Sequence, residues 1–440
     1  MEGFTIIKQS HTASVGLTKA SPEVHEALRA KGIDPDRLSV TTLGFGSHKA
    51  TIPRWLVRMG FGIALSALLH LTRYFQLEIP LYLSAMLALV VGLIILQAAC
   101  EVLVIAAERL AERYKWNHYI AGTLAEILAT IPELVVIGFL IPVSPATAFV
   151  ICIVTIYNNA LVFSLYSFFL PKDKQGKFLM PTPITEAGTQ ILIGGGSMGL
   201  ILGLVMLTFH SSGGAKSSFH HLDLVFISVV LLTIFSVYVY KLITSYAEEE
   251  AEVRATLSMS DEDVKQRLDM VYQNVKPSSR SSIALLFFAG LLGAIIGGEE
   301  VSSFATTMIA ELEFNPILTA MILALFAGMS EYVILWQSHK KQEYGIALAN
   351  AFGGITQVMF LVLPFTLLGI ALYEMTTDSV HEELPLQFSL SSIFLLLFLF
   401  PTFYTLASLL EEDHTLGVLD TTIMTGIITF VIVLLLAYGV

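Results

Sequence analysis

The sequence predicts an all-α membrane protein that crosses the bilayer about eleven times, and two observations support this fold class. Of the 440 residues, 55% are hydrophobic and only 14% are charged, with a mean hydropathy of +0.74. A soluble protein carries about 25% charged residues. In addition, apolar runs of about 20 residues recur along the chain, and each can cross a hydrocarbon core of roughly 30 Å as a helix.

Eleven apolar segments follow a polar N-terminal tail, residues 1–50. Segment 54–74 comes first, as an extra leading helix. The others cover 80–111, 118–141, 145–170, 184–209, 222–246, 281–309, 315–338, 343–372, 387–410 and 415–439. An acidic insertion, residues 247–280, separates six segments from five. We therefore expect a first block over 80–246 and a second over 281–440.

The positions of Lys and Arg predict the orientation, because both residues are in excess in cytoplasmic loops. If the N-terminus is cytoplasmic, three short loops near 109–117, 171–177 and 339–343 lie inside. Their basic residues are Arg109, Arg113, Lys115, Lys172, Lys174, Lys177, Lys340 and Lys341. Only Arg73 and Lys216 then face outward. We expect the N-terminal tail and the acidic linker to lie in the cytoplasm. We expect the host membrane to be a cell (inner) membrane rather than an organelle membrane.

The two blocks resemble each other at a fixed offset of 198 residues. Three pairs share this offset: Glu133 with Glu331, Glu101 with Glu299, and Asn159 with Gln357. The first pair aligns ATIPE with AGMSE in two apolar surroundings. Equivalent segments are five apart in the chain, so the two blocks begin on opposite sides of the membrane. The pattern therefore predicts two inverted five-helix repeats.

The central glutamate of each block lies next to a residue that disrupts helices. Pro132 precedes Glu133, and Gly328 with Ser330 precedes Glu331. A carboxylate in the middle of a membrane costs at least roughly 2.5 kcal/mol, so it faces a cavity, a partner or an ion. A broken helix also releases backbone carbonyls, which transporters with inverted repeats use to coordinate ions near the membrane midplane. The alternative is a structural pair with a basic side chain, but the spans contain almost none.

These features predict a cation site made entirely of oxygen ligands. Its candidate side chains are Glu133, Glu331, Thr130, Ser330, Asn159 and Gln357, with the two glutamates as the metal ligands. Calcium takes six to eight oxygens, and two carboxylates neutralise a divalent ion. When that ion leaves, the facing carboxylates need protons or another cation. This requirement is typical of exchange, in which calcium is the transported ion and a proton or sodium is the counter-ion.

Four further acids are candidates for a gate or a proton path: Glu101, Glu126, Glu299 and Glu300. Glu126 lies seven residues before Glu133, so an unbroken helix would place both on nearly the same face. It would then lie in the cytoplasmic vestibule. The alternative for the other three is a position near the end of a span, in contact with water.

The second block, EYVILWQSHKKQEYGIALANAFGGITQVMFLVLP, resembles the second repeat of the cation/calcium exchanger superfamily. The similarity is closest to its calcium/proton exchangers, which carry a glutamate, then a glutamine about 26 residues later, then an apolar run ending in proline. Here these are Glu331, Gln357 and Pro364, with Gly353 and Gly354 before the glutamine. The first block, AGTLAEILATIPELVV, is more similar to the sodium/calcium branch. The resemblance implies calcium export in exchange for protons.

The chain departs from the family because both blocks lack the Gly-Asn-x-x-Glu motif of proton-coupled members, which leaves sodium coupling as an alternative. A cation channel or a calcium sensor that uses the acidic linker is the rival from another class. An enzyme is disfavoured, since no nucleophile and base stand out. Nucleic-acid binding is disfavoured by the absence of a basic patch. The expected partners are inorganic cations and the lipid bilayer, without a cofactor; the sequence does not indicate an oligomeric state.

Overall fold

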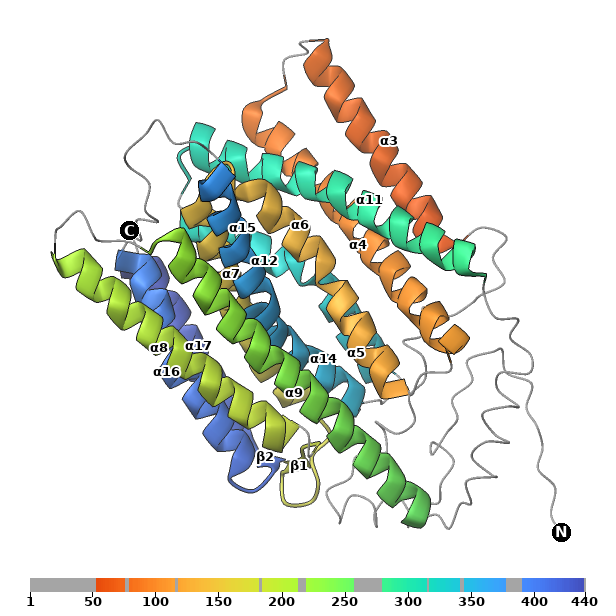
Figure 1. Ribbon diagram of the computed structural model, residues 1–440, viewed down its shortest axis with the longest axis vertical. Helices are drawn as coiled ribbons and strands as arrows, with labels where there is room; N and C mark the ends of the chain where they lie inside the picture. The colour runs from red at the N-terminus through yellow and green to blue at the C-terminus, as the bar shows by residue number, and fades with distance from the viewer. Residues whose placement is uncertain are drawn as a thin grey trace.

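A computed structural model of the chain describes residues 53–75, 79–114, 118–181, 184–212, 219–256, 279–314, 316–340, 344–376 and 390–438. The predicted N-terminal tail, residues 1–50, and positions 257–278 of the predicted acidic linker lie outside these ranges. Nearly all of the described chain is helical, as Figure 1 shows, so the predicted all-α class is confirmed.

The helices of the first half follow the predicted segments closely. They are α3 (Arg54–Tyr74), α4 (Leu81–Tyr114), α5 (His118–Ala129), α6 (Ile131–Leu140), α7 (Pro145–Tyr166), the π-helical turn η3 (Ile184–Gly188), α8 (Thr189–Ser212) and α9 (His221–Thr256). A 3₁₀ turn, η2 (Ser167–Phe169), and a short strand, β1 (Phe178–Leu179), lie between α7 and η3. Helix α9 continues past the predicted end of its segment at 246, because the run AEEEAEVRAT is rich in strong helix formers.

The second half is also almost entirely helical. Its helices are α11 (Arg280–Thr306), the π turn η4 (Thr307–Glu311), α12 (Pro316–Ala327), α13 (Met329–Lys340), α14 (Tyr344–Gln357), the π turn η5 (Val358–Val362), α15 (Leu363–Thr376), α16 (Leu390–Glu411) and α17 (Val418–Tyr438). A second short strand, β2 (Thr415–Leu416), precedes α17. The three π turns, η3, η4 and η5, were not anticipated from the sequence.

Two of the predicted segments are broken where the sequence places a helix disruptor. Helices α5 and α6 meet at a turn formed by Thr130, and α12 and α13 meet at a turn formed by Gly328. Pro132 has no backbone N–H, so the carbonyl of Leu128 cannot receive its usual helical hydrogen bond. The predicted breaks next to Glu133 and Glu331 are therefore confirmed.

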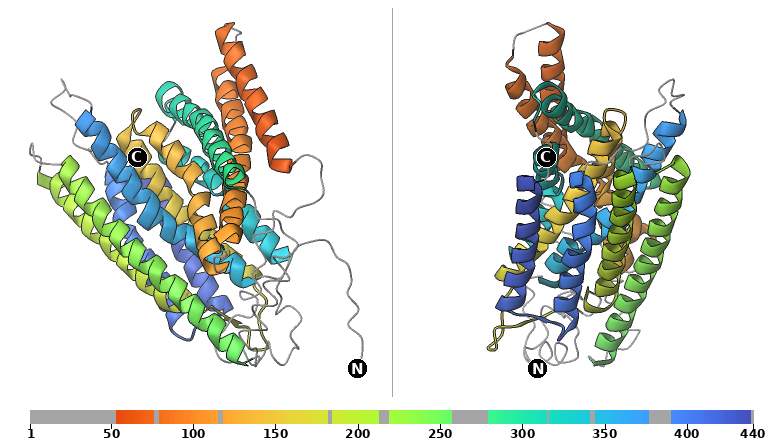
Figure 2. Two further views of the ribbon diagram at one scale, coloured as in Figure 1. Left: turned by 45° about the vertical axis from the view of Figure 1, so that its right-hand side comes forward. Right: turned by 90° about the vertical axis from the view of Figure 1, so that its left-hand side faces the viewer.

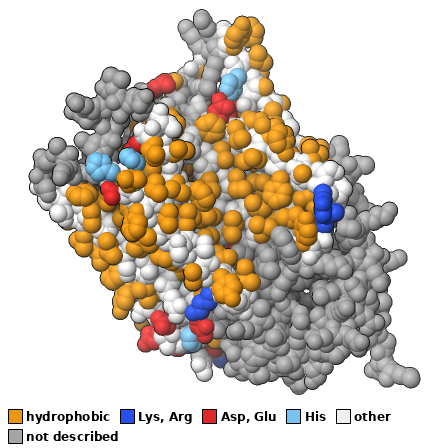
Figure 3. All heavy atoms as spheres, viewed as in Figure 1, with side chains coloured by type: hydrophobic (Ala, Val, Ile, Leu, Met, Phe, Trp, Pro, Cys, Tyr) orange, Lys and Arg blue, Asp and Glu red, His pale blue; other side chains and the backbone are white. Residues whose placement is uncertain are grey.

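Eight helices in the described part of the chain are long and apolar enough to cross a membrane. The pairs α5/α6 and α12/α13 do not qualify because the breaks shorten them, and the apolar part of α17, Val418–Leu434, is also short. Figure 3 shows a face on which hydrophobic side chains cover the middle and charged side chains lie mainly near the margins. The chain is a multi-pass integral membrane protein. The count of eleven spans and the inverted repeats stay predictions.

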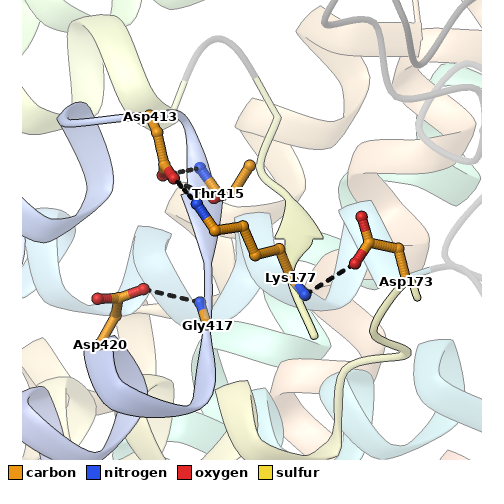
Figure 4. A network of polar contacts seen from close by, with 6 residues as sticks. All are labelled: Asp173, Lys177, Asp413, Thr415, Gly417 and Asp420. Carbon is orange, nitrogen blue, oxygen red and sulfur yellow. Dashed lines mark hydrogen bonds and ion pairs between the residues drawn. The ribbon is translucent and has the colours of Figure 1, made fainter. Parts of the chain in front are cut away.

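Two loops pair at one end of the bundle. Strand β1, from the α7–α8 connection, pairs antiparallel with β2, from the α16–α17 connection. The Lys177 ammonium bonds the Asp413 carboxylate, which also accepts hydrogen bonds from the Thr415 hydroxyl at 2.6 Å and its N–H at 3.0 Å (Figure 4). These bonds lower the pKa of Asp413 to about 2 and raise that of Lys177, the Lys177 hydrogen bond being the main cause for Asp413. Figures 1 and 2 show α5 and α8 beginning, and α9 ending, toward this same end.

Helices α4 and α11 pack closely against each other. A Cβ added at Gly92 of α4 would lie 2.6 Å from the Val301 side chain, and one added at Gly290 of α11 would lie 2.7 Å from the Leu103 side chain. The offset of 198 residues relates Gly92 to Gly290 and Leu103 to Val301. The contact of Gly290 with Leu103 is therefore the equivalent, with the two blocks exchanged, of the contact of Gly92 with Val301. A two-fold relation between the blocks predicts contacts of this kind.

Candidate cation site

The first central glutamate, Glu133, lies in the first turn of α6, directly after the break at Thr130. Its side chain is buried, and its Oε2 atom makes no hydrogen bond. A buried carboxylate oxygen without a partner is costly, and such an atom calls for a missing partner, such as an ion. The N-terminal position on a short helix is favourable for the negative charge but leaves Oε2 unpaired.

The second central glutamate, Glu331, lies in the first turn of α13, directly after the break at Gly328. The Asn350 side chain of α14 donates a hydrogen bond to the Glu331 backbone carbonyl at 3.0 Å. The Asn158 side chain of α7 donates to the Tyr332 hydroxyl at 2.5 Å and to the Ala324 carbonyl at 3.3 Å. These amides hold the broken α12/α13 segment against α7 and α14, and thereby fix the position of Glu331.

Glu331 and Asn159 meet at Gly354 of helix α14. A Cβ added there would lie 2.5 Å from Glu331 Oε2 and 2.9 Å from Asn159 Nδ2, so the missing side chain makes room for both groups. Asn159 is 2% exposed, and neither its Nδ2 nor its Oδ1 forms a hydrogen bond. Helix α6, in whose first turn Glu133 lies, packs against α7, the helix of Asn159. Glu331 and Asn159 therefore lie together at Gly354, and the buried Glu133 lies on the helix that packs beside Asn159.

Gln357 lies at the edge of this region rather than among its unpaired atoms. It is buried, and its Nε2 donates a long hydrogen bond of 3.4 Å to Glu126 Oε2 on α5. Glu126, predicted to lie in the vestibule, thus reaches a residue predicted to belong to the site. The π turn η5 begins directly after Gln357, and such turns are frequent at functional sites.

The two hydroxyl candidates have different outcomes. Thr130 is 1% exposed, and its hydroxyl donates to the Ile127 carbonyl at 2.7 Å, so its proton is already used within α5. Its oxygen retains lone pairs for a cation. The side chain of Ser330 lies outside the part of the chain that the structure describes.

The remaining acidic candidates lie on α4 and α11, and the two buried ones face the leading helix α3. Arg58 of α3 forms an ion pair with Glu101 at 3.2 Å. Ser66 of α3 donates a 2.5 Å hydrogen bond to Glu300, which is 1% exposed. Glu299 is exposed. The sequence thus missed the role of α3 as the partner of Glu101 and Glu300; their predicted part in a gate or proton path stays a prediction.

The residues that sequence reasoning undervalued are the amides that position the site. Asn158, which was not among the predicted site residues, ties α12 and α13 to α7 at the break before Glu331. Asn350 precedes Gly354 by four residues, a spacing that places both on one face of α14. This spacing is a signal that the sequence already carries.

The arrangement can hold a hard cation if further oxygens contribute. Within the described ranges, no group of three or more His, Cys, Asp or Glu side chains could hold a metal ion. Two carboxylates would therefore need the Asn159 amide oxygen, backbone carbonyls or water to complete six to eight ligands. The unpaired Glu133 Oε2 and Asn159 Oδ1 fit such a ligand set, because both are oxygen acceptors without a donor.

Comparisons with known proteins concern the second block and the fold. Residues 282–439 match the family model described as sodium/calcium exchanger protein. The chain is similar in fold to the H+/Ca2+ exchanger CAX, with a TM-score of 0.58 and 12% identity over 87% of this chain and 93% of that chain. It is also similar to native YfkE, with a TM-score of 0.54 and 13% identity over 87% of this chain and 99% of that chain. No curated protein matches the sequence. The second block, residues 282–439, therefore carries the sequence pattern of this family, and the chain shares its fold with CAX and YfkE.

Proposed function

We propose that the chain is a secondary active antiporter that exports a divalent cation, calcium, in exchange for protons, without a cofactor. Glu133 and Glu331 hold the cation, and Asn159, Thr130 and nearby carbonyls complete its ligands. Gln357 lies at the edge of the site, where its side chain is hydrogen-bonded to Glu126. Ser330, directly before Glu331, stays a candidate ligand.

The observation that carries this proposal is the set of unpaired buried acceptors. Glu133 Oε2 and Asn159 Oδ1 are buried without a partner, and the Asn159 amide lies with the Glu331 carboxylate at Gly354. Both glutamates directly follow a broken helix in a membrane protein. In a structural ion pair, a Lys or Arg would neutralise Glu133, whereas its Oε2 has no hydrogen-bond partner. A transported cation would supply the missing charge, and two carboxylates match a divalent ion in charge.

The need for a counter-ion follows from the same geometry. Two ionised carboxylates near each other in a poorly solvated region repel each other once the divalent ion leaves. Protons that bind the pair remove this repulsion and allow the empty carrier to return. We place the end of the bundle with β1 and β2 in the cytoplasm, because Lys172, Lys174 and Lys177 lie in its loop.

The test is calcium uptake into proteoliposomes that contain the full chain, driven by an imposed pH gradient in the absence of sodium. We expect uptake by the wild type, loss of uptake in Glu133→Gln and in Glu331→Gln, and normal uptake in the control Glu186→Gln. Glu186 is an exposed carboxylate at the start of η3, outside the site. Unchanged uptake in either site variant would contradict the two-glutamate mechanism.

Sodium coupling at the same residues is the second candidate, and the match of residues 282–439 to a family described as sodium/calcium exchanger protein favours it. Uptake that requires a sodium gradient and ignores the pH gradient would select this counter-ion. The variants Glu133→Gln and Glu331→Gln would then abolish sodium-driven uptake instead. The site would stay the same, and only the counter-ion would change.

A further inference from the structure

A third carboxylate reaches the edge of the proposed site from helix α5. Glu126 Oε2 accepts the 3.4 Å hydrogen bond of Gln357 Nε2. A Cβ added at Gly353 would lie 3.4 Å from the same oxygen, so Glu126 lies against the backbone of α14 at this glycine. Glu126 is partly exposed, whereas Glu133 is buried.

The positions of Gly353 and Gly354 connect Glu126 to the central region. These adjacent glycines of α14 face different carboxylates: Gly353 faces Glu126, and Gly354 faces Glu331 and the unpaired amide of Asn159. A cation that leaves Glu126 along α14 therefore meets Glu331 and the unpaired Asn159 next.

Glu126 does not share one coordination shell with the two central glutamates. No group of three acidic, His or Cys side chains that could hold a metal ion occurs in the part of the chain that is described. The break at Thr130 separates α5 from α6, so Glu126 and Glu133 belong to different helices. A carboxylate that is near the site but outside its shell can bind the ion before or after the central pair does.

We propose that Glu126 and Gln357 form a second cation subsite, which exchanges a hard divalent cation between the Glu133/Glu331 site and the end of the bundle where α5 begins. This inference rests on the proposed function. Glu126 attracts the cation with its charge, and the amide oxygen of Gln357 offers a neutral ligand when the ion displaces the hydrogen bond. The subsite therefore affects cation binding from one face of the membrane and does not directly affect binding from the opposite face.

A purely structural role for Glu126 predicts a different result. If its carboxylate only held Gln357 in place, its loss would disturb the central site and weaken the cation affinity on both faces together. A subsite changes the affinity on one face. Sidedness therefore separates the two roles.

The experiment measures the KM for calcium on each face separately, in sealed membrane vesicles of known orientation that contain the full chain. The variants are Glu126→Gln, Glu126→Asp and the control Glu186→Gln, which removes an exposed carboxylate outside the site. We expect Glu126→Gln to raise the KM about tenfold on the face where α5 begins, or about 1.4 kcal/mol, and less than about twofold on the other face. Glu126→Asp keeps the charge and recovers most of the affinity; Glu186→Gln changes neither face.

Three outcomes would overturn the inference. An unchanged KM in Glu126→Gln on the face where α5 begins would show that Glu126 takes no part in cation entry. An equal rise on both faces, or complete loss of exchange in both Glu126 variants, would assign it a structural role. Absence of calcium exchange in the wild type would overturn the proposed function and this subsite together, whereas the first two outcomes leave the proposed function intact.

Discussion

The substitution Gly354→Ala tests the geometry of the site with a single methyl group. The added Cβ would lie 2.5 Å from Glu331 Oε2 and 2.9 Å from Asn159 Nδ2. Carbon and oxygen at van der Waals contact are about 3.4 Å apart, so the Glu331 carboxylate would have to move by about 1 Å. Calcium–oxygen distances span only about 0.3 Å, between roughly 2.3 and 2.6 Å, so this shift removes a ligand.

We expect Gly354→Ala to lower calcium uptake about hundredfold, the cost of a misplacement of about 1 Å at a reacting or binding group. Stability should change little, because the displaced group is the far end of a flexible side chain. Alanine in place of glycine within a helix also gains about 0.5–1 kcal/mol. The assay compares uptake into proteoliposomes with the unfolding temperature of the purified protein.

Gly353→Ala is the matched control one residue earlier in the same helix. Its Cβ would lie 3.4 Å from Glu126 Oε2, an ordinary contact that requires no shift. The Gly353→Ala variant should gain the same helix stability as Gly354→Ala and should keep most of the wild-type calcium uptake. Normal uptake in Gly354→Ala, or an equal loss in Gly353→Ala, would refute the placement of Glu331 and Asn159 around Gly354.

Three further predictions concern the helix packing and the paired loops. Ser66→Ala removes a hydrogen bond to the buried Glu300 and should destabilise the protein by about 1–3 kcal/mol. The measurement is the unfolding temperature, which should fall; an unchanged unfolding temperature would show that α3 does not hold Glu300. Gly92→Leu places a side chain against Val301 at the α4–α11 crossing and should cost at least about 1–3 kcal/mol by the same assay, whereas Gly60→Leu, with open space around its Cβ, should be neutral. Hydrogen bonds from Lys177 and Thr415 lower the pKa of Asp413 from 3.8 to about 2. The ionised Asp413 carboxylate therefore adds fully to the free energy of unfolding above about pH 4, and this contribution is lost as the pH falls through about 2. A carboxyl titration of Asp413 by NMR should show this midpoint, and Lys177→Met should return it toward 3.8.

The sequence was sufficient to predict where the helices lie and where two of them break. Apolar runs with the length of a membrane helix locate the segments, and Pro132 predicts a break because it cannot donate a backbone hydrogen bond. Helix α9 extends beyond its apolar run, since its polar continuation is set by helix propensity, which a search for apolar segments ignores. The fixed offset of 198 residues identified Glu133 and Glu331 together.

The partners of the individual side chains could not be predicted, because they depend on contacts between distant helices. Nothing near Glu101 in the sequence indicates Arg58, which lies 43 residues earlier on α3. The link between Gln357 and Glu126 joins residues 231 positions apart. A spacing within one helix tells which residues share a face, but the neighbour of that face follows only from the packing.

Direct calcium binding tests the central claim that Glu133 and Glu331 hold one cation between them. Isothermal titration of the purified full chain in detergent, with Glu133→Gln, Glu331→Gln and the control Glu186→Gln, measures binding without any assumption about the counter-ion. The account predicts one calcium per wild-type chain, unchanged binding in the control, and loss of binding in each of the two site variants. Undiminished calcium affinity in either Glu133→Gln or Glu331→Gln would contradict the account.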